Sequence, residues 1–290
     1  NTISSLWSFT PSNKELAQMT SDNKNLLGAT GFEFMPDGRI LTSKVETAKS
    51  NLVLLTADGK EEKLLTNDDN FNGQAVVSPD GKYIVFCSSK ANTLSLWRID
   101  ADGSNPVQLT NPNNEFDSRP QITVDGKFVI FERRTADFIR ASILKIPIEG
   151  GEATHLISDE KQMLMLPKLS DDGKSLVYTT MDFDKANTRF NRSVRVLTMS
   201  SDKIGELKKE FNTYFGYNYR FTPDGKHLTH INQAGVPNIY NIPLDGSAPK
   251  PVTNFNSGHI VNFAWSKDGK KLYLVRAIIN SEIVLLRNVG

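Results

Sequence analysis

Side chains that could act in nucleophilic, acid–base or metal chemistry are few and dispersed in this sequence. The chain has one cysteine, Cys87, and four histidines, His155, His227, His230 and His259. Cys87 lies in an apolar run typical of a buried strand, where a thiol packs as a small core residue. His227 and His230 fall three residues apart in one predicted strand, on opposite faces, so they cannot ligate one metal. We therefore expect no catalytic residue, no metal and no cofactor.

Motifs that build enzyme active sites are also missing. The sequence contains no Gly-x-Ser-x-Gly nucleophile motif and no glycine-rich phosphate loop. Nine of the 20 aspartates stand in Asp-Gly pairs, where the side chain caps its own turn. One trio could still combine an acid, a base and a cation, namely Asp117, Arg119 and His259. This trio is the basis of an enzymatic alternative, a carbohydrate lyase or hydrolase, to a chain that binds without catalysis.

The dominant pattern in the chain is a repeated Asp-Gly pair followed by a basic residue and an apolar run. The pair recurs 43 to 52 residues apart, at Asp37, Asp80, Asp125, Asp172, Asp224 and Asp268. Asp-Gly between two β-rich runs is a hairpin turn, because glycine adopts a positive φ without steric cost. A second hairpin follows in most units, for example Leu94–Asp100 returning at Val107–Thr110. Each unit therefore contains four short strands.

Four strands in about 40–50 residues is the size of one propeller blade. We predict a single all-β domain over residues 1–290, a six-bladed β-propeller with units that start near residues 32, 75, 120, 167, 219 and 263. Residues 1–20 complete the last blade, so that N- and C-terminal strands pair and no sheet edge stays open. Both Leu6-Trp7 and Glu282–Leu286 read as the third strand of that blade. Leu6-Trp7 could thus be an extra edge strand, or part of a seventh blade.

The repeat resembles that of TolB-like (PD40, WD-like) propellers. One near-complete copy comprises Ser78–Lys82, Leu96-Trp97, Asp102-Gly103 and Leu109-Thr110. The unit around Asp172 departs from the pattern, with Asp171 in place of proline. Phe263–Leu272 and Ser281–Asn288 are similar to the ends of propellers fused to bacterial Ser/Thr kinases and CadC-like winged-helix regulators. The resemblance implies a periplasmic or extracytoplasmic sensor or docking module of a bacterial signalling or envelope protein.

In a propeller, the first strand of each blade lines a central channel, and the long loops lie on the face opposite the Asp-Gly turns. Six equivalent positions open these first strands, five residues before the residue that precedes each Asp-Gly. They are Gly31, Gln74, Arg119, Leu166, Asn218 and Asn262. We expect them at the channel mouth near Asp117 and His259, where they contact a small ligand, an ion or, more commonly, water.

The longest predicted loops on this face belong to the fourth unit, over Thr180–Arg192 and Glu210–Tyr217. They gather aromatic and arginine side chains, which is the composition of protein-interaction hot spots. The predicted contact residues are Arg189, Arg192, Tyr214, Phe215 and Tyr217. The alternative is that these rings only pack their loops onto the blade.

Composition narrows the partner classes further. The chain has 34 basic and 33 acidic residues, a formal net charge of +1, which gives no electrostatic reason to expect nucleic acid or an anionic membrane. No apolar run approaches the ~20 residues of a membrane span. The sequence begins at Asn1 without a signal-peptide pattern, as an excised domain would. We expect a monomer that binds a protein or small-molecule ligand on the long-loop face, without nucleic acid or membrane insertion.

Overall fold

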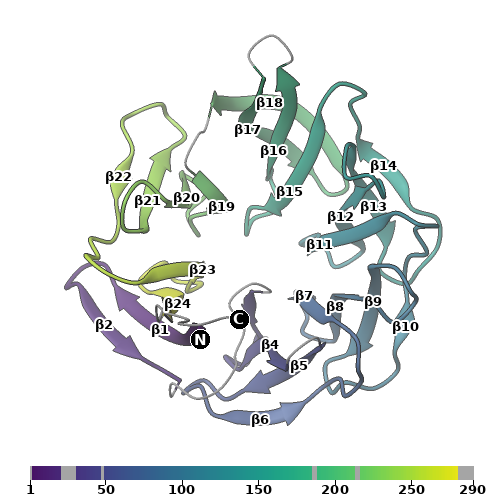
Figure 1. Cartoon of the computed structure of the whole chain (residues 1–290), viewed down its shortest axis with the longest axis horizontal. Helices are drawn as coiled ribbons and strands as arrows, with labels where there is room; N and C mark the ends of the chain where they lie inside the picture. Colours follow the sequence, from purple (N-terminus) through teal and green to yellow (C-terminus); the bar gives the residue numbers. More distant parts are fainter. Residues whose placement is uncertain (1, 21–30, 47–48, 185–187, 213–215, 280–290) are drawn as a thin grey trace, which may run out of the picture.

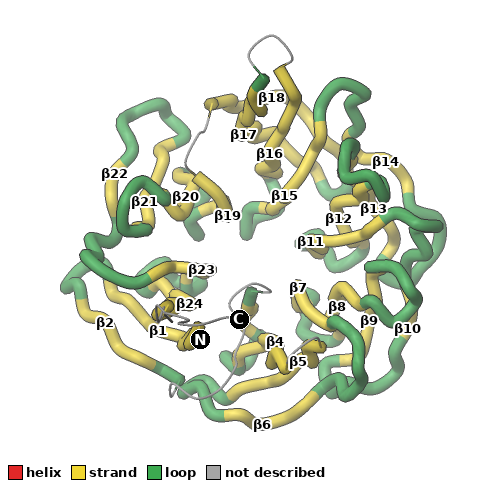
Figure 2. Tube along the Cα trace, in the orientation of Figure 1, coloured by secondary structure: helices red, strands yellow, loops and turns green. Residues whose placement is uncertain are grey.

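Figure 1 shows the computed structural model, which describes residues 2–20, 31–46, 49–184, 188–212 and 216–279. Six four-stranded antiparallel sheets stand as blades around a central axis, which confirms the predicted six-bladed propeller. The described residues form only strands and loops (Figure 2), and they contain no helix that could cross a membrane.

The blades are numbered one to six in the order of their innermost strands along the chain. Blades one and two contain β3 (Phe32–Phe34), β4 (Ile40–Glu46), β5 (Lys49–Leu55), β6 (Glu61–Leu64), β7 (Asn72–Val77), β8 (Tyr83–Ser88), β9 (Ser95–Asp100) and β10 (Val107–Gln108). Blades three and four contain β11 (Phe116–Ile122), β12 (Phe128–Arg134), β13 (Ala141–Pro147), β14 (Thr154–Ile157), β15 (Met163–Leu169), β16 (Ser175–Asp184), β17 (Arg189–Ser200) and β18 (Lys203–Asn212). Blades five and six contain β19 (Gly216–Phe221), β20 (His227–Asn232), β21 (Asn238–Pro243), β22 (Lys250–Pro251), β23 (His259–Trp265), β24 (Leu272–Ile279), β1 (Thr2–Thr10) and β2 (Glu15–Gln18).

The Asp-Gly pairs form the turns between the first two strands of each blade. In blade two, the amide of Lys82 donates to Asp80 Oδ1 at 3.1 Å, and the Ser78 hydroxyl donates to the same oxygen at 2.7 Å. Gly81 has a φ of 73°, which a residue with a side chain rarely adopts. The bonds from Ser78 and Lys82 hold the pKa of Asp80 below its usual range. These aspartates are therefore turn caps, as the motif predicted.

The ring is closed by the N-terminal strands. β1 lies between β24 and β2, and it pairs with β24 along eight residues, from Thr2 opposite Ile279 to Phe9 opposite Leu272. Leu6-Trp7 is thus the third strand of blade six, neither an extra edge strand nor part of a seventh blade. The competing segment, Glu282–Leu286, lies outside the described residues.

The hydrophobic core lies between neighbouring blades. Phe131 of blade three packs in one cluster with Val85 of blade two, and Phe263 of blade six packs with Ile231 of blade five. Cys87 is buried in the first of these clusters, and burial raises the pKa of its thiol to about 12. A thiol that stays protonated is a poor nucleophile, so Cys87 acts as a core residue.

One sequence-based expectation about blade four is wrong. Thr180–Arg192 was expected to be a loop, but β16 and β17 continue through most of it as a hairpin with an unbroken register from Ser175–Thr198 to Asp184–Arg189. These two strands have 10 and 12 residues, whereas the second and third strands of the other blades have 6 to 9. Likewise, much of Glu210–Tyr217 belongs to β18 and β19. Blade four therefore carries a long hairpin on the long-loop face.

Candidate functional site

The six mouth positions are sites of irregular backbone in the innermost strands or, for Gly31, directly before one. Gln74, Arg119, Leu166 and Asn218 have φ values of 53° to 60°, and each lies where its strand shifts register against the next. Gly31 also has a positive φ, and Asn262 follows a similar shift in β23. Left-handed backbone at residues other than glycine costs free energy and tends to cluster at binding sites or structural joints.

Several polar groups at the mouth join neighbouring blades. Gln74 Oε1 of blade two accepts a hydrogen bond of 2.8 Å from the amide of Arg119 in blade three. The amide of Leu166 in blade four donates to Glu132 Oε2 of blade three at 2.9 Å, and Asn218 Nδ2 donates to Asn262 Oδ1 at 2.8 Å. At Gln74, Asn218 and Asn262, hydrogen-bonding capacity is thus already used in part to hold the ring together.

The proposed acid–base trio occupies different environments. Asp117 is fully buried, and both its carboxylate oxygens accept from Arg133, at 2.7 and 2.8 Å. Arg119 is exposed at the channel, with its Nε 3.7 Å from Glu132 Oε2, and His259 is exposed at the start of β23. A ligand could reach Arg119 and His259, whereas both carboxylate oxygens of Asp117 are hydrogen-bonded to Arg133.

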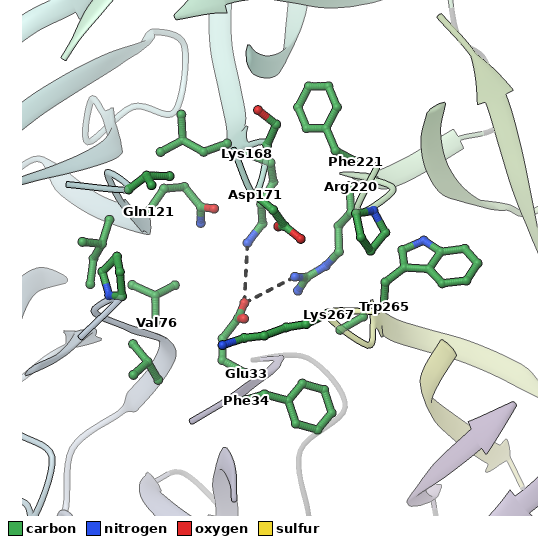
Figure 3. A pocket seen from close by; sticks show the side chains of 18 of the residues that line it. Glu33, Phe34, Val76, Gln121, Lys168, Asp171, Arg220, Phe221, Trp265 and Lys267 are labelled. Carbon is green, nitrogen blue, oxygen red and sulfur yellow. Dashed lines mark hydrogen bonds and ion pairs between the residues drawn. The ribbon is translucent and has the colours of Figure 1, made fainter. Parts of the chain in front are cut away.

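A charged cluster lies deeper in the channel and was missed by the sequence analysis. Figure 3 shows Glu33, Lys168 and Arg220 pointing toward one another from blades one, four and five. Glu33 Oε1 lies 3.3 Å from Arg220 Nη1 and 4.0 Å from Lys168 Nζ. These residues stand two positions beyond Gly31, Leu166 and Asn218. Because side chains alternate along a strand, this spacing is the sequence signal that predicts them on the channel side.

Two cavities along the central axis adjoin at this cluster. One of about 440 Å³ lies toward the long-loop face, and one of about 510 Å³ opens among the Asp-Gly turns. The residues that line both are Glu33, Val76, Gln121, Lys168 and Arg220. Within the described part of the chain, no group of three His, Cys, Asp or Glu side chains could hold a metal ion.

The electrostatics of the channel are unusual at Lys168. The pKa of Lys168 is lowered to about 7, mainly by burial and secondly by the positive charge of Arg220. The negative charge of Glu33 partly opposes this shift. Burial, together with Glu33, also raises the pKa of Asp171 at the Asp-Gly end of the same channel. The channel thus holds an amine that changes charge near neutral pH.

Replacing Lys168 by methionine is expected to stabilise the fold in a pH-dependent way. With a folded pKa of about 7, below the ordinary ~10.4 of the unfolded chain, Lys168 destabilises the native state most below pH 7. That penalty fades as the pH rises toward ~10.4, so the gain from Lys168→Met should be about 1 kcal/mol or more at about pH 6 and smaller at about pH 9. Urea unfolding at both pH values measures it, with exposed Lys82→Met as the control. A gain that is equal at both pH values, or a loss, would contradict this assignment.

The long-loop face carries a second feature, an exposed aromatic pair on the blade-four hairpin. Phe183 and Phe190 lie opposite each other, with ring centroids 5.1 Å apart, and are 48% and 58% exposed. Arg192 pairs with Met181 further along the same hairpin, and Arg189 is exposed beside Phe190. Tyr214 and Phe215 lie outside the described residues, as does the side chain of Tyr217.

Blade three adds apolar residues to the same face, which the sequence analysis also missed. Phe138 and Ile139, in the loop between β12 and β13, are 56% and 67% exposed. Phe138 stacks on Phe116 at 5.1 Å, and Arg134 lies over its ring. The sequence signal for this patch is a pair of adjacent apolar residues in the short loop that joins the second and third strands of the blade. We call Phe138, Ile139, Phe183 and Phe190 the aromatic face.

Comparison with protein-family models gives no match. An uncharacterized protein of Agrobacterium fabrum is 25% identical over 205 residues, which cover 68% of this chain and 67% of that protein. The structure is similar to TolB from Acinetobacter baumannii, with a TM-score of 0.62 and 16% identity over 94% of this chain. The chain spans only 63% of that TolB. Oligogalacturonate lyase from Vibrio parahaemolyticus gives a TM-score of 0.61 and 10% identity, over 95% of this chain and 98% of the lyase. These likenesses establish a fold of the TolB-like propeller type.

Proposed function

We propose that this chain is a non-enzymatic recognition propeller that docks a protein partner on its aromatic face. The observation that carries the proposal is the pair Phe183–Phe190, two exposed rings held together on a hairpin longer than that of the other blades. The two residues are cross-strand partners, which keeps their rings together although no other part of the described chain buries them.

The physical argument rests on the hydration of these rings. Each Å² of apolar surface removed from water contributes roughly 25 cal/mol, and aromatic and arginine side chains supply most of the energy in protein interfaces. Phe183 and Phe190 are flanked by Arg189 and Arg192, and Arg134 lies beside Phe138 in blade three. Rigid aromatic anchors beside arginines suit a protein surface better than they suit a small polar metabolite.

The setting that fits this role is outside the cytoplasm of a bacterium. The TolB-like repeat and fold, and the likeness of Phe263–Leu272 to propellers fused to bacterial Ser/Thr kinases and CadC-like winged-helix regulators, support a sensor or docking module of an envelope or signalling protein. In this proposal the domain acts as a monomer and contacts neither nucleic acid nor the lipid bilayer.

Substitution of Phe183 and Phe190 by alanine is expected to weaken partner capture by about tenfold or more, since two interface anchors would be lost. The measurement is capture from an envelope fraction of the native host by the tagged domain, quantified by mass spectrometry. Val124→Ala is the matched control, because Val124 is 49% exposed on the opposite face. Folding should be unaffected, since both phenylalanines are exposed. If wild type and the double variant capture the same proteins in the same amounts, the aromatic face is not the docking surface.

A second candidate function is a channel enzyme that acts on acidic carbohydrates. The observation that favours it is Lys168, an amine with a pKa of about 7 beside Arg220, which could remove a proton next to a carboxylate. The fold likeness to oligogalacturonate lyase points the same way. Turnover of oligogalacturonate by the purified domain, lost in Lys168→Met, would support this function over the docking proposal.

A further inference from the structure

The charges in the channel are unbalanced around Glu33. The cavity toward the long-loop face is lined by three basic side chains, those of Arg119, Lys168 and Arg220, and by one carboxylate, that of Glu33. Glu132 lies behind the wall, where it accepts hydrogen bonds from Arg134 and from the amide of Leu166. Of the three channel cations, it forms an ion pair with Arg119, at 3.7 Å, and so offsets the charge of that residue only in part.

The basic groups also retain unused hydrogen-bonding capacity. Charge-assisted N–H···O bonds are usually about 2.7–2.9 Å long. The contacts of Glu33 with Arg220 and Lys168 are 3.3 and 4.0 Å, and that of Arg119 with Glu132 is 3.7 Å. Arg220 Nε is buried and has no hydrogen-bond partner among the described residues. These cations are gathered in one place, and the described carboxylates satisfy them only in part.

The walls of the channel are built to hold this arrangement. Lys168 and Arg220 are largely buried, and each stands two positions after a left-handed residue of its own strand, Leu166 in β15 and Asn218 in β19. Keeping an amine and a guanidinium so close in a buried site costs free energy, because each disfavours the charge of the other. An anion placed between them would remove that cost.

We infer that the central channel binds a small di- or tricarboxylate between Arg119, Lys168 and Arg220. Glu33 already presents one carboxylate to two of these groups, which shows the ligand chemistry that they accept. The two adjoining cavities, of about 440 and 510 Å³, provide room for a small multivalent anion. This site is independent of the aromatic face, so that either assignment can fail without the other.

Opposite responses of two variants test the inference. Citrate and succinate are titrated calorimetrically into the intact protein at low ionic strength, since salt screens such contacts. Lys168→Gln is expected to weaken citrate binding about tenfold, the loss of one strong charge contact. Glu33→Gln is expected to strengthen it several-fold, because a competing carboxylate is removed. Lys82→Gln, at an exposed turn, should leave the affinity unchanged.

The pH supplies a further readout that a purely structural role would not move. The charged groups that face Lys168 are Glu33, Arg220 and Arg119. Because an anion favours the protonated amine, wild-type affinity should fall as the pH is raised from about 7 to about 9, where the carboxyl groups of both ligands are ionised, and this dependence should vanish in Lys168→Gln. Absence of citrate and succinate binding to the wild type would overturn the inference. So would shifts of the same sign in Glu33→Gln and Lys168→Gln, provided that circular dichroism shows both variants folded.

Discussion

Removal of residues 1–20 is expected to abolish cooperative folding of the propeller. β1 supplies the third strand of blade six, so its loss leaves β24 with an unpaired edge along eight residues. It also strips Leu6 and Phe9 from two inter-blade clusters. Each such side chain contributes roughly 1.5–3 kcal/mol, and a domain has only about 5–15 kcal/mol in total. The truncated chain should therefore aggregate or unfold without a sharp thermal transition.

Rescue in trans is the control for this deletion. A synthetic peptide spanning residues 1–20 should pair with β24 and restore a cooperative transition in calorimetry. A scrambled peptide of the same composition should not. A truncated chain that remains monomeric, and that unfolds within about 1 kcal/mol of the intact protein, would show that β1 does not close the ring.

Asp117→Ala is expected to destabilise the fold by about 3–5 kcal/mol. Asp117 is fully buried and accepts two hydrogen bonds from Arg133. Without it, the guanidinium of Arg133 keeps only Glu115, at 3.7 Å. A partly buried guanidinium that loses both of its short hydrogen bonds costs far more than a surface ion pair contributes. Chemical denaturation of the purified variant measures the loss.

Arg119→Ala provides the comparison within the same strand. Its side chain is exposed and contacts Glu132 only at 3.7 Å, so its removal should change the free energy of unfolding by about 0.5 kcal/mol or less. The two substitutions should thus differ several-fold in effect. Equal losses from both would mean that Asp117 is not a structural residue.

The fold could be predicted from sequence because the turns that separate its strands are determined by local residues. Each Asp-Gly turn depends on bonds within five residues, as Ser78, Asp80 and Lys82 illustrate. Four strands between successive turns then leave a propeller as the natural arrangement, and alternation fixes which side chains face the channel. The same reasoning, carried two residues beyond Leu166 and Asn218, would have reached Lys168 and Arg220.

Other features depend on contacts that sequence spacing does not give. Residues Thr180–Arg192 are rich in polar residues and read as a loop, yet cross-strand pairs such as Phe183–Phe190 hold them as a hairpin. Whether a polar residue faces a ligand or a neighbouring blade depends on the curvature of the ring. Gln74 and Asn262 illustrate this, since each forms a hydrogen bond with a residue of a neighbouring blade.

Site-specific photo-crosslinking would show whether a protein partner docks on the aromatic face. A photoreactive phenylalanine at position 190 and another at position 124 would be introduced separately and irradiated in the native host. We expect a discrete crosslinked partner from position 190, competed by excess wild-type domain, and none from position 124 on the Asp-Gly face. No crosslinked protein from position 190, or the same protein from both positions, would contradict it.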